Sequence, residues 1–271
     1  MISQGPDAND FLTVQEIELT SAQTDSPVNV TPTDENVRLA SAATSTLETP
    51  TLETAIPRTS CEITAQGFAS KAAMIELTLN APCLPNERVT VHHRGMMFTQ
   101  TTTLDGTLKT TVPAMDENAL VIFAFTNGDG AVTQVQVPEL RQYSRTAIQW
   151  KGDAGFEMHA HEIGASYGET GHVWKDTPRD PNAVDEGLVF LTRLGNRDVA
   201  EGLMAEVYSV PKGMSEQSGI VDLCIEAEVT ALNCGLEIEA QSLEVITGDV
   251  NSRDLTLAVP DCDATKLSSV E

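Results

Sequence analysis

The sequence has few basic residues, and this scarcity excludes two classes of partner. Among 271 residues there are 16 Lys and Arg against 40 Asp and Glu, which gives a formal net charge of −24. Binding to nucleic acid requires clustered positive charge that neutralises phosphates, so we expect no nucleic-acid partner. The same reasoning excludes docking on an anionic membrane surface.

Long apolar runs and cofactor motifs are also missing. The longest apolar run, residues 119–125, falls well short of the roughly 18–20 residues that a membrane helix needs. The sequence contains neither a P-loop nor a Rossmann glycine fingerprint, so nucleotide chemistry has no support. No C-x-x-C occurs, which excludes a zinc ribbon and a thioredoxin-type motif.

The five cysteines favour disulfide bonds. The most economical pairs stay within one half of the chain and are Cys61–Cys83 and Cys234–Cys262, with Cys224 left as a free thiol. Turn residues flank the paired cysteines, as they do where a disulfide joins strand ends. Because disulfides persist in oxidising compartments, we predict a periplasmic or cell-envelope location.

The N-terminus does not carry the signal that this location requires. Residues 1–6 (MISQGP) contain no basic segment and no apolar segment of the kind that opens a secretory signal peptide. We therefore expect that a signal or anchor is missing from this chain. The alternative is a cytosolic protein whose thiols are reduced.

Residues 1–60 form a predicted tail and linker of low complexity. From Thr20 to Ser60, nineteen of forty-one residues are Ser, Thr or Pro. Such a segment cannot bury enough apolar surface to offset the entropy of ordering it, so we expect a disordered tether.

From residue 61 onward the sequence predicts an all-β fold. Apolar and polar residues alternate over residues 75–79, 88–92 and 221–229, which indicates half-buried strands. Asp105-Gly106 between two strand-like runs predicts a hairpin. We predict two tandem antiparallel β-sandwich domains, residues 61–140 and 141–264, and a tail at 265–271. A single larger β-domain is the alternative, and a helix is possible only around residues 197–207.

The best candidate site is Glu157-x-His159-x-His161, where strand geometry puts all three side chains on one face. Two imidazoles at this spacing can share a divalent metal ion. His172 could return across the following loop as a further ligand. The alternative is a polar solvent face that happens to contain histidines.

Two other sequence features give less support for chemistry. Residues 164–168 match the G-x-S-x-G string of a serine-hydrolase elbow, but the residues that follow cannot open a helix. Cys224 lies among carboxylates on the outer side of its predicted strand, where we expect a thiol of low reactivity. We assign no catalytic residue.

Residues 61–138 resemble small β-sandwiches known as carboxypeptidase regulatory-like or CNA-B-like modules. The resemblance is carried by Phe98-Thr-x-Thr, Leu104-Asp-Gly and Val112-Pro-Ala114. It implies a spacer, a stalk, or a unit that binds carbohydrate or protein.

The span from Cys61 to Cys262 resembles a set of uncharacterised alphaproteobacterial envelope proteins, some of them labelled translocases. The strings that carry this resemblance are Asn86-Glu-Arg-Val-Thr-Val-His-His-Arg-Gly-Met-Met-Phe98, Gln149-Trp-Lys-Gly-Asp-Ala-Gly155, Gly171-His-Val-Trp174, Phe190-Leu-Thr-Arg-Leu-Gly195 and Asn233-Cys-Gly235. In that set an apolar N-terminal segment precedes the linker, and Cys224 is an addition here. No ATP site supports the label, and the resemblance supplies no catalytic residue.

Together these observations predict a non-catalytic envelope module that binds or spaces, with an envelope protein or a glycan as its partner. Its oligomeric state is left open. The alternatives are a metal-binding protein or metal-dependent enzyme that uses Glu157, His159, His161 and His172, and a hydrolase or glycan-active enzyme without a recognisable motif.

Overall fold

The computed structural model describes residues 62–186, 188–212, 221–246 and 249–262, which belong to one compact unit. Within these ranges the fold is all-β and every strand pairing is antiparallel, which confirms the predicted fold class. The predicted linker at 1–60 and the tail at 265–271 lie outside the described residues. No helix in the described part of the chain is long and apolar enough to cross a membrane.

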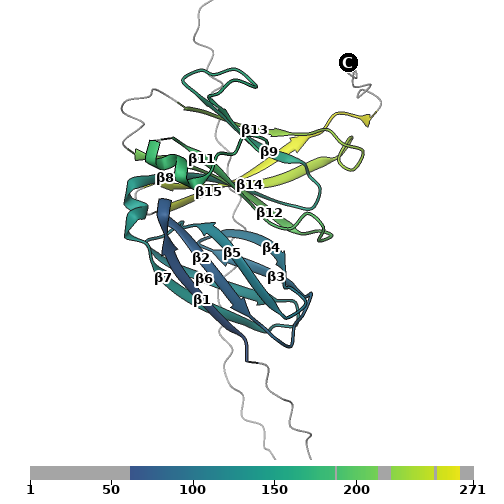
Figure 1. The fold of residues 1–271 in the computed structure, drawn as a ribbon. Coiled ribbons are helices and arrows are strands. Elements are labelled where there is room, and N and C mark those ends of the chain that lie inside the picture. The colour runs from purple at the N-terminus through teal and green to yellow at the C-terminus, as the bar shows by residue number, and fades with distance from the viewer. Residues whose placement is uncertain (1–61, 187, 213–220, 247–248, 263–271) are drawn as a thin grey trace, which may run out of the picture. The chain divides into compact units, whose positions relative to one another are not determined.

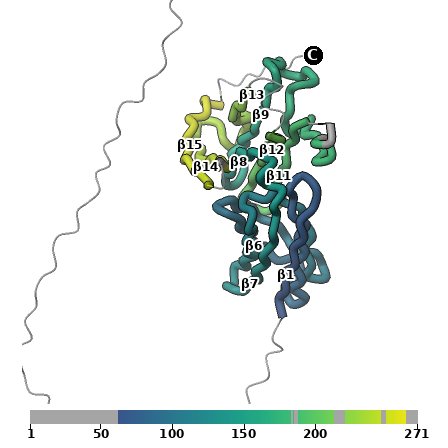
Figure 2. The backbone as a smooth tube through the Cα atoms, turned by 90° about the vertical axis from the view of Figure 1, so that its left-hand side faces the viewer, coloured from purple at the N-terminus to yellow at the C-terminus, as the bar shows by residue number. Residues whose placement is uncertain are grey.

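The first half of the described chain forms two facing sheets (Figure 1). One sheet has the order β1-β2-β5, with β1 at Thr64–Ser70, β2 at Met74–Asn80 and β5 at Thr107–Pro113. The other has the order β4-β3-β6-β7, with β3 at Arg88–His93, β4 at Met96–Thr101, β6 at Asn118–Phe125 and β7 at Gly130–Gln136. The tube view shows β1 near β7 at one margin of this sandwich (Figure 2).

The second half also forms two sheets. The larger has the order β11-β12-β8-β14-β15, with β8 at Tyr143–Lys151, β11 at Phe190–Leu194, β12 at Leu203–Pro211, β14 at Glu237–Ile246 and β15 at Asp249–Ala258. The smaller has the order β10-β9-β13, with β9 at Phe156–Glu162, β10 at His172–Val173 and β13 at Val221–Ala227. Three short 3-10 helices complete the list of described elements: η1 (Lys71–Ala73), η2 (Pro138–Gln142) and η3 (Pro181–Glu186).

Two local expectations are wrong. Asp105-Gly106 does form a turn, but β4 before it and β5 after it belong to different sheets, so the turn connects two layers instead of closing a hairpin. Gly106 has φ +75°, and a Cβ there would lie 2.1 Å from the Ala81 carbonyl oxygen. In the region considered for a helix, residues 203–207 begin β12 instead, because pairing with β8 and β11 buries most of this strand.

The largest core cluster contains side chains from both halves. Ala147, Val207 and Leu243 of the second half belong to the same buried cluster as Phe98 and Phe123 of the first. The two predicted domains therefore share a core, and the boundary at residues 140–141 stays a prediction.

Arg145, a buried residue of β8 in the second half, forms hydrogen bonds with the backbone of the first half. Its guanidinium donates to the carbonyl oxygens of Ala114 and Ala72, each at 2.6 Å, and its side chain is fully buried. Burial of this cation lowers the pKa of Arg145 to about 9.

We expect Arg145→Ala to lower the free energy of unfolding by about 3–5 kcal/mol, because it opens a cavity and leaves two buried carbonyls without donors. Urea denaturation measures this change. The control is Arg141→Ala, which removes an exposed pair with Glu117 and should leave the free energy of unfolding close to that of the wild type, because exposed ion pairs contribute little. Equal losses for the two variants would contradict the role given to Arg145.

Candidate functional site

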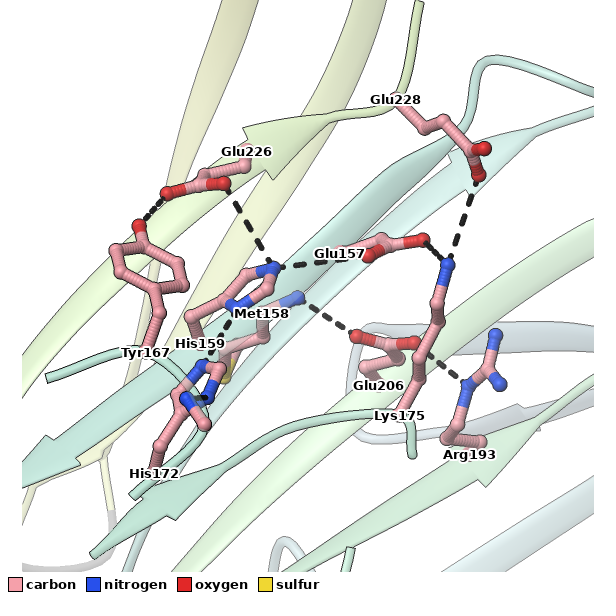
Figure 3. Close-up of polar contacts among 11 residues, drawn as sticks. Glu157, Met158, His159, Tyr167, His172, Lys175, Arg193, Glu206, Glu226 and Glu228 are labelled. Atoms are coloured by element: carbon pink, nitrogen blue, oxygen red, sulfur yellow. Dashed lines mark hydrogen bonds and ion pairs between the residues drawn. The ribbon is translucent and has the colours of Figure 1, made fainter. Parts of the chain in front are cut away.

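The candidate site lies on one face of β9, and the alternation of that strand sets its direction. Phe156, Met158 and Ala160 belong to the second core cluster, as the sequence predicts. Glu157, His159 and His161 therefore lie on the other side of the strand, away from that cluster. Figure 3 shows Glu157 and His159 among the polar contacts on this side.

His172 joins this face through strand pairing, as the sequence suggests it could. In the short ladder of β10 with β9, His172 lies opposite His161. Its Nε2 atom is 2.9 Å from Nδ1 of His159. The intervening loop turns tightly at Gly171, where a Cβ would lie 2.8 Å from that of Ala165. The loop therefore returns the third imidazole to the other two.

Two aromatic side chains that the sequence analysis did not single out complete the cluster. The ring of Trp174 stacks on His159 and His172, with centroids 5.1 Å and 5.4 Å apart. Tyr167 meets His161 and His172 edge-on, at 4.7 Å and 5.0 Å. Trp174 follows His172 by two residues, and this strand-like spacing was a usable signal; Tyr167 comes from the loop and had none.

Hydrogen bonds determine which nitrogen carries the proton in each neutral imidazole. The Gly168 N–H points at Nδ1 of His172, at 3.1 Å, so the proton of His172 is on Nε2 and is donated to Nδ1 of His159. His159 then carries its proton on Nε2. His161 donates from Nδ1 to the Ala165 carbonyl oxygen at 2.8 Å. Desolvation lowers the pKa of His172, and the neighbouring His159 and His161 lower it further, which favours the neutral form of His172.

Strand β13 adds acidic side chains to the same face. Its register with β9 places Glu226 opposite Glu157 and Cys224 opposite His159. The Nε2 atom of His159 is 3.6 Å from a Glu157 carboxylate oxygen and 3.8 Å from a Glu226 oxygen.

Two further residues hold the carboxylates in place. The Tyr167 hydroxyl donates to Glu226, which raises the pKa of Tyr167 to about 12. The Lys175 ammonium pairs with Glu157, and this contact raises the pKa of Lys175. Lys175 also lies 3.6 Å from a Glu228 oxygen and 5.4 Å from the Trp174 ring centroid.

Glu206 of β12 contacts the backbone of β9 through its carboxylate (Figure 3). One of its oxygens accepts the Met158 N–H at 2.8 Å, and the other accepts Nε of Arg193 at 2.7 Å. Burial raises the pKa of this carboxyl group. No local sequence pattern indicated Glu206, because its partners lie on other strands.

The four predicted metal ligands are gathered on one face, but their donor atoms are engaged with one another or with neighbours. Within the described ranges, no group of three or more His, Cys, Asp or Glu side chains is placed to hold a metal ion. One lone pair each on His159 and His172 accepts a hydrogen bond, and Glu157 is paired with Lys175. Metal binding by this set stays a prediction.

The cysteines agree with the predicted pairing where the structure describes them. Cys234 and Cys262 form a disulfide bond with their Cα atoms 5.0 Å apart, and Cys224 is an exposed free thiol. Cys61 lies outside the described residues, so its bond with Cys83 stays a prediction. Ser166 of the G-x-S-x-G string lies in the loop between β9 and β10, and its backbone N–H donates to Glu169.

A cavity of about 160 Å³ lies beside the Lys175 end of the cluster. Trp150, Glu157 and Glu228 are among the residues that line it. Glu157 therefore contributes both to the cavity wall and to the cluster of rings and carboxylates on β9.

Comparisons with known proteins identify no family. Neither a protein-family model nor a curated protein matches this chain. Among solved structures, it is similar to a gamma-CGTase from Alkalophilic bacillus clarkii, at 12% identity and TM-score 0.19, covering 69% of this chain and 24% of the other. It is also similar to a C-terminal 282-residue intimin fragment in complex with the intimin-binding domain of its translocated receptor, at 14% identity and TM-score 0.20, covering 73% and 63%. The chain thus spans less than two thirds of either protein, and similarity at these scores carries no argument about fold or function.

We expect the buried Glu206 carboxyl to make stability depend on pH. Because its pKa in the folded protein is raised above the usual value of 4.5 for glutamate, the folded state binds the proton more tightly, and stability falls as pH rises from about 4.5 through the folded-state pKa. Glu206→Gln removes this contribution. The unfolding free energy of the wild type minus that of the variant should therefore decrease with rising pH, by at most about 1.4 kcal/mol per pH unit. Urea titrations at several pH values measure it, and a difference that increases with pH would contradict the assignment.

Proposed function

We propose that this chain is a non-catalytic binding module of the cell envelope, and that it binds its partner through the outer face of β9, β10 and β13. The residues that line this outer face are Glu157, His159, His161, Tyr167, His172, Trp174 and Glu226. Among them Glu157, His159 and His172 are buried, so a partner would contact chiefly the other four. One observation carries the proposal. Imidazole, aromatic and carboxylate side chains from β9, β10, β13 and the loop between β9 and β10 converge on one sheet face.

The character of these side chains supports binding. Tyrosine and tryptophan present large contact areas at a small cost in conformational entropy, and they are frequent binding hot spots. Tyr167 is 59% exposed, yet its hydroxyl is held by Glu226 and its ring meets two imidazoles. An exposed side chain that is already oriented loses little further freedom when a ligand covers it.

The disulfide supports the envelope as the location. The disulfide joins Cys234, three residues before β14, to Cys262, four residues after β15. Bonds of this kind persist in the periplasm and are rare in a reducing cytosol. An envelope protein or a glycan is the partner that such a location offers.

We expect Trp174→Ala and Tyr167→Ala each to reduce recovery of the partner from a native envelope extract by about tenfold or more, as loss of an aromatic hot spot does. The measurement is a quantitative pull-down with the full chain as bait. Phe68→Ala is the matched control, because Phe68 is an aromatic residue of β1 that is 63% exposed. Recovery that is unchanged in both site variants, or lost equally in the control, would contradict the proposal.

Metal binding is the second candidate function, and one arrangement favours it. The Nε2 atom of His159 faces carboxylate oxygens of Glu157 and Glu226 at 3.6 Å and 3.8 Å, beyond hydrogen-bonding distance. Ligand atoms on one tetrahedral zinc ion lie about 3.3 Å apart, so a small inward movement would bring the three atoms around an ion. An ion at Nε2 would require the proton of His159 to move to Nδ1 and be donated to Nε2 of His172, so that His172 supports the ligand as residues next to metal ligands commonly do. The proton of His172 would then move to Nδ1, and the hydrogen bond from the Gly168 N–H would be lost.

For this second candidate we expect tag-free protein to take up zinc stoichiometrically, with His159→Ala abolishing the uptake. Elemental analysis after dialysis and zinc calorimetry measure it. His92→Ala is the control, because His92 lies on β3 in another sheet. Less than about a tenth of an ion per chain, unchanged in His159→Ala, would exclude a metal site here.

A further inference from the structure

Strand β13 is the edge of its sheet. It pairs with β9 on one side, and the described residues supply no strand on its other side. Asp222, Leu223, Cys224 and Ile225 are all exposed. A free edge of this kind presents backbone N–H and C=O groups that an extended chain can pair with.

The two faces of β13 have different chemistry. Asp222, Cys224 and Glu226 continue the outer face, opposite His161, His159 and Glu157 in the β9 register. Leu223 and Ile225 are on the other face, together with Val221 and Ala227, which pack against the core. The free edge therefore has an acidic side and an apolar side.

The apolar side is incompletely covered. Leu223 is 39% exposed and Ile225 is 36% exposed. On β15, the edge strand of the larger sheet, Leu257 is 42% exposed and is spaced two residues from Leu255, which packs against the same core. We call Leu223, Ile225 and Leu257 the apolar margin. Large apolar side chains left open at two sheet edges indicate a sandwich that can accept another strand.

We propose that β13 binds an extended segment of a basic partner protein as an added strand, an inference that rests on the proposed function of the outer face. In an added strand, alternate side chains point to opposite faces. Those on the outer face would meet Asp222 and Glu226, and so would be Lys or Arg. Those on the other face would cover Leu223 and Ile225 of the apolar margin, and so would be Val, Ile or Leu.

Contacts already present on the outer face show what a basic side chain finds there. The Lys175 ammonium contacts Glu157 and lies 3.6 Å from Glu228 and 5.4 Å from the Trp174 ring centroid. The carboxylate of Glu226 and the ring of Tyr167 offer the same chemistry closer to the free edge. Attraction of a cation to a carboxylate beside an aromatic face is favourable at a partly desolvated site.

Charge disfavours a second copy of this chain as the occupant. An antiparallel pair of β13 strands centred on Cys224 would place Asp222 of one copy opposite Glu226 of the other. Like charges directly opposite each other destabilise a strand pair. The net charge of −24 adds long-range repulsion between copies and attraction for a basic segment.

The test uses the full chain and a fluorescent peptide of alternating Lys and Val, about eight residues long, which is enough to span β13. Two peptides serve as controls: one has Glu in place of Lys, and the other is N-methylated at every residue, which removes all of its backbone donors. We expect fluorescence anisotropy to show binding that is weakened about tenfold or more in both controls and by added salt. Amides of Val221–Ala227 should gain protection from hydrogen exchange when the peptide binds.

Protein variants separate this inference from the proposed function. Leu223→Lys and Ile225→Lys should weaken peptide binding by about tenfold or more, whereas Phe68→Lys, on β1, should leave it unchanged. No peptide binding, equal binding of the N-methylated peptide, or protection located away from β13 would overturn strand addition. If Trp174→Ala still reduces recovery of a partner from envelope extract in that case, the proposed function stands and only the added strand fails.

Discussion

The burial of one side of β9 is the constraint on which the rest of the site depends. Phe156, Met158 and Ala160 remain in the core only if the intervening residues face outward, so His159 and its neighbours are placed by the hydrophobic effect acting on other side chains. Glu206 reinforces this placement from the sheet below by accepting the Met158 N–H. A shift of one residue in the register of β9 would turn an imidazole into the second core cluster and turn Phe156 out of it.

The imidazoles are then organised by polar contacts that only the folded chain can supply. Gly168 in the loop and the pairing of β10 with β9 bring His172 against His159. The hydrogen bond from Gly168 determines which nitrogen of His172 carries the proton, and the hydrogen bond from His172 does the same for His159. Carboxylates from β13 border the same rings. The outcome is a face that is rich in hydrogen-bonding and aromatic groups, fixed in orientation before any ligand arrives, and next to an edge strand of mixed acidic and apolar character.

Local periodicity was enough to predict the all-β class, the outward direction of Glu157, His159 and His161, and the side of β13 on which Cys224 lies. It failed where the partner of a segment decides its structure. The same Asp-Gly signal is compatible with a hairpin or with a turn between layers. Residues 203–207, in the segment considered for a helix, belong to β12 because β8 and β11 flank that strand. Tyr167, Lys175 and Glu206 could not be assigned to the site from sequence because their partners are distant in the chain.

The central claim is that the outer face contacts a partner in the envelope, and in vivo photo-crosslinking tests it most directly. A photoreactive phenylalanine analogue is placed at position 167 in one strain and at position 68 in another, each in the protein expressed in its natural host. The account predicts a discrete crosslinked product from position 167 and none from position 68. Crosslinking from position 68 alone would contradict it and would assign the binding surface to the sheet that contains β1.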